Sequence, residues 1–234
     1  MRTLLGSCTK HDATGFEKTP LYNSLLKNLI TQRTEKTVLY TGDIDAVIKT
    51  NNQDNIGKHY NRVLEMSIDE KYDCVILMHD DVSVEDKFLF DKIAEGFQEH
   101  DVVGLAGARN IELKEPTLWH IMSEQSTWSG AVAHPVSNDQ VFMTNFGPTP
   151  ARCLVLDGLF LAIKVSSLTD KVRFDENIPA VAHAYDIDFS LTCNDNNLKL
   201  TTWPIWVVHR SPGLEKPDDQ FSNAQKYFLD KWKR

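Results

Sequence analysis

The first 108 residues alternate between short apolar runs and amphipathic helical patterns, and this alternation constrains the fold more than any other feature of the chain. The apolar runs have the length and the aliphatic composition of buried strands. Across the whole chain such runs lie at 3–8, 37–41, 73–78, 102–106, 153–156, 159–165 and 198–209. Strands and helices in regular alternation predict an α/β fold with a mostly parallel central sheet, flanking helices and right-handed crossovers.

Helical patterns fill the gaps between the first of these runs. Thr19 can cap a helix whose first residue is Pro20. A second helix is expected over 57–67, and Ser83 with Asp86 forms a Ser-x-x-Asp start signal for a third. In a sheet built this way, ligands bind at the carboxyl ends of the strands.

The regular pattern dissolves between residues 112 and 150, where polar residues surround a set of aromatic side chains. A long irregular segment in a compact domain is usually a functional loop or lid, or else it hides an element that the pattern does not reveal. The last expected element is an amphipathic helix over 218–233, and we expect residues 1–234 to form one domain.

The composition narrows the choice of partners and compartment. The 33 Asp and Glu outnumber the 25 Lys and Arg, giving a net charge of −8, which disfavours a protein that wraps nucleic acid over its whole surface. The longest apolar runs, 74–78 and 159–163, fall far short of the ~20 residues that span a bilayer. Widely spaced cysteines without a C-x-x-C pair indicate reduced core residues, and we therefore expect a cytoplasmic protein. These cysteines are Cys8, Cys74, Cys153 and Cys193.

A buried strand ends abruptly at His79-Asp80-Asp81. Two adjacent acids at the end of a central strand repel each other and lose hydration, so they call for a compensating cation. Mg²⁺ or Mn²⁺ fits oxygen ligands and is commonly completed by the phosphates of a substrate. The alternative is that both acids only cap the following helix.

Two later features can also carry chemistry. Asp186 and Asp188 open a helical pattern, where the helix dipole stabilises carboxylates. One of them can instead act as a general base toward an acceptor hydroxyl. His209 follows the strand-like run 203–208, and a lone histidine there is either a structural residue or a ligand.

Taken together, these features resemble a family 2 type glycosyltransferase of the GT-A fold, a single Rossmann-like α/β domain that transfers a sugar from a nucleotide donor. The resemblance covers most of the chain, and its motifs occur in the expected order. The matching segments are Asn55-Ile56-Gly57-Lys58 with Asn61, His79-Asp80-Asp81 in place of the Asp-x-Asp motif, Asp157-Gly158, Tyr185-Asp186 and His209.

The resemblance implies a metal-dependent, inverting transferase whose donor is a nucleotide sugar, with UDP as the expected nucleotide. Asp80 would contact the donor ribose, while Asp81 and His209 would hold Mn²⁺ or Mg²⁺ at the diphosphate. Asp186 would be the general base and Asp188 its supporting acid. The other donor-binding positions would be Ser7, Cys8 and Asp43 at the nucleobase, together with Gly57, Lys58, Asn61, Asp157 and Gly158.

By the same resemblance, residues 1–108 would form the nucleotide-sugar-binding half and residues 109–234 the acceptor-binding and catalytic half. Two residues depart from the family pattern. His79 replaces the usual first Asp of the metal motif, and Tyr185 replaces the usual Glu before the base. The residues assigned to the metal and to the base are present, so we expect an active enzyme.

The acceptor is expected to be a hydroxyl of a saccharide or glycoconjugate. A phage-type transfer to a hydroxymethylated DNA base is the alternative, because four basic residues lie between 226 and 234, although a closing helix with a solvated basic end gives the same pattern. A non-catalytic nucleotide-sugar-binding module is the alternative of another class. A metal-dependent phosphohydrolase using Asp80, Asp81 and His209 would release phosphate without an acceptor.

Overall fold

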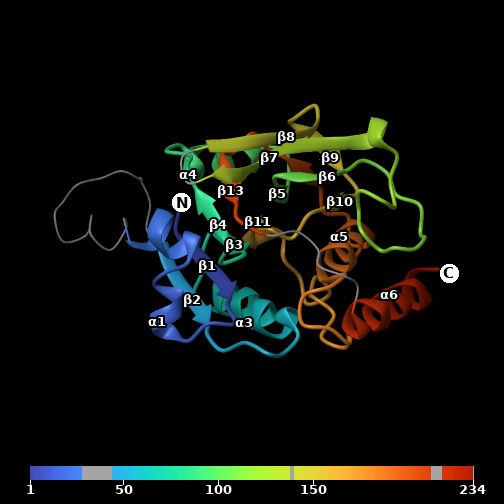
Figure 1. The fold of residues 1–234 in the computed structure, drawn as a ribbon, viewed down its shortest axis with the longest axis horizontal. Coiled ribbons are helices and arrows are strands. Elements are labelled where there is room, and N and C mark those ends of the chain that lie inside the picture. The colour runs from blue at the N-terminus through green and yellow to red at the C-terminus, as the bar shows by residue number, and fades with distance from the viewer. Residues whose placement is uncertain (28–43, 138–139, 212–217, 234) are drawn as a thin grey trace.

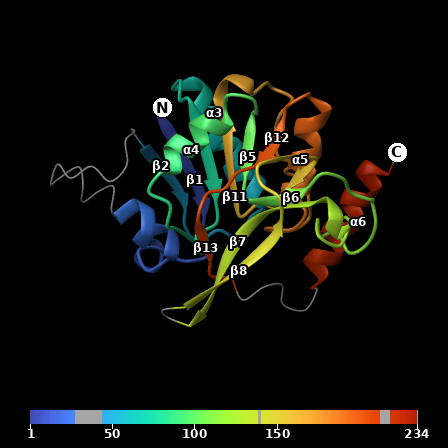
Figure 2. The ribbon, with the colours of Figure 1, turned by 90° about the horizontal axis from the view of Figure 1, so that it is seen from above.

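The computed structural model describes residues 1–27, 44–137, 140–211 and 218–233. Its larger sheet has seven strands in the order β2-β1-β3-β11-β5-β12-β9 (Figure 1; β12 is labelled in Figure 2). These strands are β1 (Thr3–Cys8), β2 (Ile44–Lys49), β3 (Cys74–Met78), β5 (Val102–Gly104), β9 (Ala151–Cys153), β11 (Phe160–Lys164) and β12 (Leu200–Thr202). All run the same way except β11 and β9, so the mostly parallel central sheet expected from the sequence is confirmed.

The second sheet covers much of the stretch in which the sequence pattern dissolves. Its strands are β4 (Val82–Val84), β6 (Ala106–Ala108), β7 (Trp128–Ser137), β8 (Gln140–Gly147), β10 (Val155–Leu156) and β13 (Val207–His209). The long hairpin of β7 and β8 reaches beyond the other strands of its sheet (Figure 2). Of the two alternatives for 112–150, a functional loop or a hidden element, the second holds where β7 and β8 lie. The sequence pattern did not reveal β8 because this strand is largely exposed and lacks the apolar alternation of a half-buried strand.

The helices match the sequence pattern less uniformly. They are α1 (Ala13–Phe16), α3 (Ile56–Asp69), α4 (Leu89–Gly96), α5 (Tyr185–Asp195) and α6 (Asp219–Trp232), with the π-helix η1 (Tyr22–Leu26) and the 3-10 turns η2 (Gln125–Thr127) and η3 (Val165–Ser167). The start signal at Ser83 is wrong, because Ser83 lies in β4. The helix begins only at Leu89, after Asp86 accepts the N–H of Phe88. The strand expected at 37–41 lies outside the described residues.

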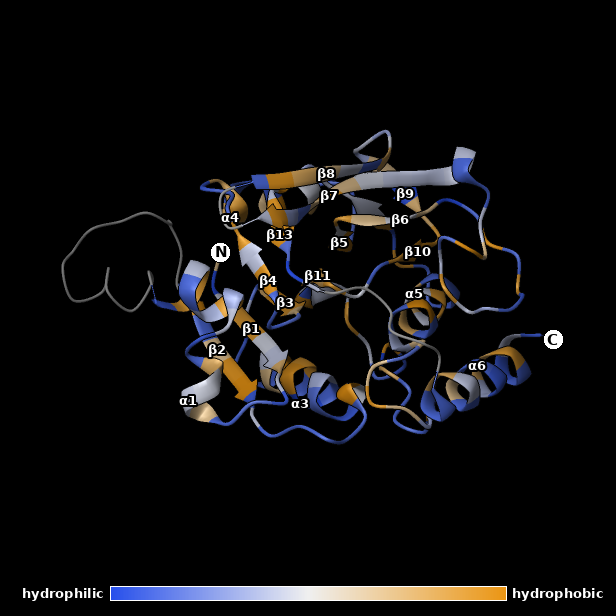
Figure 3. Cartoon of the chain, in the orientation of Figure 1, coloured by the Kyte–Doolittle hydropathy of each residue, from blue (hydrophilic) through white to orange (hydrophobic). Residues whose placement is uncertain are grey.

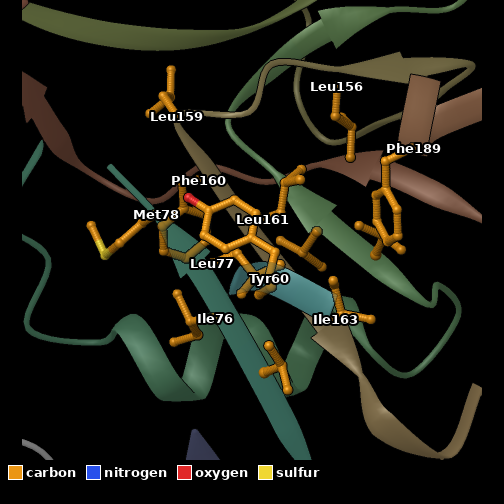
Figure 4. Packing of buried hydrophobic residues seen from close by; sticks show 14 of the residues in the cluster. Tyr60, Ile76, Leu77, Met78, Leu156, Leu159, Phe160, Leu161, Ile163 and Phe189 are labelled. Atoms are coloured by element: carbon orange, nitrogen blue, oxygen red, sulfur yellow. The ribbon is translucent and has the colours of Figure 1, made fainter. Parts of the chain in front are cut away.

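The core lies between α3, the strands β3 and β11, and α5. Its largest side chains, including Tyr60, Leu77, Phe160 and Phe189, are fully buried (Figure 4). The central strands are rich in hydrophobic residues, whereas α6 carries many hydrophilic ones (Figure 3). All four cysteines are free thiols, as expected. Within the described part of the chain, no helix combines the length and apolarity that crossing a bilayer requires.

The C-terminal helix α6 is fastened to the domain by a buried ionic network. Lys231 donates to Asp188 and Asp175 at 2.8 Å, and the indole of Trp232 donates to Asp188 at 2.7 Å. Burial raises the pKa of Asp188, whose side chain is only 1% exposed. Burial lowers the pKa of Lys231, but its two carboxylate partners outweigh this and raise it. The buried carboxylate of Asp188 therefore depends on the positive charge of Lys231 for its stabilisation.

Replacing Lys231 with methionine should destabilise the fold by about 3 kcal/mol, because it leaves the buried Asp188 carboxylate without its cation. For a chain of this size, that corresponds to a melting temperature lower by about 6–12 °C. Thermal unfolding followed by circular dichroism measures the effect. Lys226→Met, at an exposed position of the same helix, is the matched control. Equal melting temperatures for the two variants would show that the network does not stabilise the chain.

Candidate active site

A cluster of three side chains forms where two strands of different sheets end. His79 and Asp81 lie in the turn between β3 and β4, and His209 is the last residue of β13, paired with Val82. Asp81 Oδ1 lies 3.4 Å from His209 Nε2 and 3.9 Å from His79 Nδ1. One ligand atom from each residue fits within 4.8 Å of the others.

The donor set of this cluster fits a divalent metal ion. Asp81 Oδ1 is buried and has no hydrogen-bond partner among the described residues, an arrangement that costs free energy unless something else binds the oxygen. Two imidazoles and one carboxylate are a common ligand set for divalent transition ions. Asp81 and His209, expected at the metal, therefore lie together, and they are joined by His79, which was not expected to be a ligand.

Within the cluster, the histidines and Asp81 shift one another's pKa values. Burial raises the pKa of Asp81, but its interactions with His209 and His79 outweigh this and lower it. Burial lowers the pKa of His209, but the interaction with Asp81 and the charge of Asp157 raise it overall. Burial also lowers the pKa of His79. Asp81 is therefore an anion at neutral pH, ready to bind a cation.

Two further carboxylates, Asp157 and Asp186, lie near this cluster. The Gly158 N–H donates to Asp186 Oδ2 at 3.0 Å, and the Trp119 indole donates to Asp157 Oδ2 at 2.8 Å. Burial, together with the negative charge of Asp157, raises the pKa of Asp186 to about 7. A carboxylate with a pKa near the working pH is suited to general-base catalysis.

Tyr185 joins the two groups of residues. Its hydroxyl lies 2.6 Å from His79 Nε2, and the next residue along α5 is Asp186. Gly158 makes room for this contact, since a Cβ at that position would clash with the Tyr185 hydroxyl. Position 158 therefore requires glycine, because a larger residue would displace Tyr185. The backbone N–H of the same residue holds Asp186.

A cavity of about 320 Å³ brings these residues to a common space. It is lined by His79 and His209 from the three-residue cluster, by Asp157 and Asp186, and by aromatic side chains that include Trp119. Residues 117–120 form one wall of the cavity, and Trp119 within it packs edge-on against Trp128 of β7 and Phe146 of β8.

Two neighbouring cavities share Asp80 and Asp81. One, of about 180 Å³, is lined by Cys8 at the end of β1 and by Asp80, which follows β3. The other, of about 740 Å³, is lined by the same two acids and by three basic side chains, of which Lys10 also lines the smaller cavity. These are Lys10, Lys18 and Arg210, which sequence reasoning missed. The available signal was that Arg210 follows β13 directly and that Lys10 lies two residues after β1.

Gly57 and Asn61, expected at the donor, support a distant loop in the structure. Asn61 donates to the Phe174 carbonyl at 3.0 Å and accepts the Phe174 N–H at 2.9 Å. Gly57 lies against the same residue, where a Cβ would come within 2.9 Å of the Phe174 side chain. Lys58 instead forms an exposed ion pair with Asp54 at 3.8 Å. None of the three lines the cavities described above.

Three other expected residues have different outcomes. Asp188 faces α6, where both its oxygens are bound by Lys231 and Trp232. Ser7 is fully buried, and its hydroxyl has no hydrogen-bond partner among the described residues. Asp43 lies outside the described residues.

Comparison with known protein families gives a match over most of the chain. The family described as "Glycosyltransferase like family" matches residues 38–232. No curated protein matches the chain. The crystal structure of A197 from STIV superposes with a TM-score of 0.51 at 12% identity, covering 93% of this chain and 98% of that one. The catalytic domain of Drosophila beta1,4galactosyltransferase 7, in complex with xylobiose, superposes with a TM-score of 0.53 at 9% identity, covering 96% and 80%. At these identities the structural matches support the fold alone.

Proposed function

Because the chain belongs to the glycosyltransferase-like family, we propose that it transfers a sugar from a nucleotide-sugar donor to a hydroxyl acceptor with the help of a divalent ion and with inversion at the anomeric carbon. One observation carries the proposal. The cavity of about 320 Å³ is lined both by His79 and His209, which flank a buried anion, and by Asp186, whose pKa of about 7 suits a general base. A metal site and a base in one cavity are the two parts that such a transfer needs.

The three-residue cluster is the proposed place for Mn²⁺ or Mg²⁺. Asp81 and His209 would hold the ion, with His79 as a third ligand. Bound there, a divalent ion supplies Lewis-acid stabilisation of the negative charge that develops on the leaving diphosphate.

The donor is placed by the residues around this cluster. We propose that Lys10, Lys18 and Arg210 bind the phosphates in the cavity of about 740 Å³ and that Asp80 contacts the ribose. Cys8, Ser7 and Asp43 remain the proposed nucleobase residues, with UDP as the proposed nucleotide. Residues 1–108 would then contribute most of the donor site. Gly57, Lys58 and Asn61 would act on the donor only through the segments that they support.

Asp186 performs the proton transfer in this proposal. As the acceptor oxygen attacks the anomeric carbon, its proton passes to Asp186, and the bond from that carbon to the phosphate oxygen breaks with its electron pair leaving on the diphosphate. The Gly158 N–H holds Asp186 Oδ2, which keeps the carboxylate in the cavity of about 320 Å³. Asp157, held by Trp119, keeps the proton affinity of Asp186 high. Asp188 stabilises α5 by its contacts with α6 and does not touch the acceptor.

The acceptor is proposed to be a neutral saccharide or glycoconjugate. Among the described residues that line the cavity of about 320 Å³, none is Lys or Arg, whereas Trp119 and Phe221 offer aromatic surface. Of the basic residues near the C-terminus, Lys231 is paired with Asp175 and Asp188. A DNA acceptor would need cations along its backbone, so this surface favours the uncharged acceptor.

A screen of nucleotide sugars tests the proposal. The full chain is incubated with Mn²⁺, a panel of UDP- and GDP-sugars and a panel of neutral saccharides, and release of the nucleoside diphosphate is measured. Release from one donor, faster with an acceptor, is the expected result. A donor that binds without turnover under every condition would show a binding module, and release of inorganic phosphate without an acceptor would show a phosphohydrolase.

The rate of transfer should fall as the pH drops below about 7. Burial and Asp157 raise the pKa of Asp186 to about 7, and only its ionised form can accept the proton. Below that pH, kcat/KM should fall about tenfold for each unit of pH. A pH–rate profile with saturating Mn²⁺ measures this. An acid limb near pH 4, the value for an ordinary carboxylate, would contradict the assignment.

A further inference from the structure

The two residues at which the chain departs from its family pattern, His79 and Tyr185, touch each other although they are 106 positions apart in sequence. Building on the proposed function, we propose that Tyr185 fixes the His79 ring as a nitrogen ligand, and that the resulting site binds transition ions in preference to Mg²⁺. Tyr185 acts through His79, so it is a positioning residue and not a catalytic one.

The hydrogen bond decides which ring nitrogen faces the site. Tyr185 Oη lies 2.6 Å from His79 Nε2, while His79 Nδ1 points toward Asp81 Oδ1 at 3.9 Å. A neutral imidazole that binds a metal through Nδ1 carries its proton on Nε2. That proton needs an acceptor, and the Tyr185 hydroxyl oxygen supplies it. The backbone of His79 is held as well, since its N–H donates to the Leu159 carbonyl at 3.1 Å.

The Tyr185 ring is held in turn by its own neighbours. It is 4% exposed and packs against Tyr60 and Phe174, with ring centroids 6.1 and 6.2 Å away. Gly158 lies directly against its hydroxyl. A ligand whose partner is packed this tightly cannot rotate away, so the geometry of His79 is set before any ion binds.

The chemistry of the ligand set then determines which ion binds best. Mg²⁺ prefers oxygen ligands and gives up its water reluctantly, whereas imidazole nitrogens favour transition ions, with affinity rising from Mn²⁺ to Co²⁺. His79 and His209 supply two nitrogens against the one carboxylate of Asp81. An acid in place of His79 would bring two carboxylates to the site and remove this preference.

The test measures metal binding directly on the full chain without donor. Titration calorimetry gives the affinities for Mn²⁺ and Mg²⁺, and the visible absorption of bound Co²⁺ reports the ligand set. Wild type should bind Mn²⁺ at least about tenfold more tightly than Mg²⁺. Tyr185→Phe should weaken Mn²⁺ and Co²⁺ binding by about 10–100-fold, leave Mg²⁺ nearly unchanged and alter the Co²⁺ spectrum.

Two further variants keep the test decisive. Tyr72→Phe is the matched control, because it removes another hydroxyl that bonds a single side chain, Asp45 at 2.8 Å, outside the cavities of the site. His79→Asp should shift the preference toward Mg²⁺, and it tests the same claim if Tyr185→Phe fails to fold.

The outcomes separate this inference from the proposed function. Unchanged Mn²⁺ affinity and Co²⁺ spectrum in Tyr185→Phe would overturn the role of Tyr185, and so would equal affinities of wild type for Mn²⁺ and Mg²⁺. In both cases, a loss of binding in Asp81→Asn would leave the proposed metal site standing. A wild type that binds none of the three ions would instead overturn the metal site of the proposed function, and this inference with it.

Discussion

Replacing Asp186 with asparagine should lower kcat for sugar transfer by about 10²–10⁴-fold while leaving donor affinity unchanged. The amide has the shape of the carboxylate and keeps an oxygen that can accept the Gly158 N–H, so the Asp157-Gly158 turn should stay in place. It cannot take a proton from the acceptor. The measurement is steady-state kinetics with the donor and acceptor found in the screen, together with the affinity for the nucleoside diphosphate.

The control for this variant is Asp195→Asn, which removes an exposed carboxylate from the same helix, α5. It should transfer sugar at the wild-type rate. Unchanged turnover in Asp186→Asn would remove Asp186 from the mechanism. A loss of donor affinity equal to the loss of rate would show that Asp186 binds the donor and is not the base.

Replacing Asp81 with asparagine should abolish metal binding and reduce transfer by more than about 100-fold, because the ion is expected to supply several kcal/mol of stabilisation to the leaving diphosphate. Asp81 supplies the only carboxylate of the cluster, and its buried Oδ1 has no other partner among the described residues. Calorimetric titration with Mn²⁺ and kinetics in excess chelator measure the two effects. Both treatments should lead to the same residual rate.

The matched variant is Asp91→Asn, which removes an exposed carboxylate of α4. It should keep the metal affinity and turnover of wild type. Activity that resists chelation would contradict the metal site, and so would an Asp81→Asn variant that still binds Mn²⁺ as wild type does.

The parallel part of the sheet could be predicted from the sequence because its strands are buried on both faces. The expected runs at 3–8 and 73–78 correspond to β1 and β3, whose residues are almost entirely buried. Exposed strands give no such signal. β8 is exposed over most of its length and lay in a segment expected to be either a loop or a hidden element, and β2, half-exposed at the sheet edge, was not predicted at all.

The site could be predicted where a residue's role follows from its local position. Asp81 follows a buried strand and His209 ends another, so both could be named from the sequence as candidate metal ligands, and the structure brings them together. The contact between His79 and Tyr185 could not be found, because it joins residues 106 positions apart whose types do not suggest a pair. This contact depends on the packing of α5 against the Asp157-Gly158 turn.

Helix geometry gives a further signal that the sequence reasoning did not use. Residues two apart in a helix point to nearly opposite sides. Asp186 and Asp188, both in the first turn of α5, therefore cannot face the same cavity. Asp186 lines the cavity of about 320 Å³, and Asp188 turns to α6. The spacing alone could have separated the proposed base from the anchoring acid.

The most direct test of the central claim is ³¹P NMR of the products formed from nucleotide sugar, Mn²⁺ and acceptor, recorded after the paramagnetic Mn²⁺ has been removed with a chelating resin. Transfer by the proposed mechanism breaks the bond between the anomeric carbon and the phosphate oxygen, so nucleoside diphosphate should be the phosphorus-containing product, and it should form only when Mn²⁺ is present. Nucleoside monophosphate with sugar phosphate, or inorganic phosphate, would mean that the enzyme attacks phosphorus, and it would contradict the assignment of this chain's residues to sugar transfer.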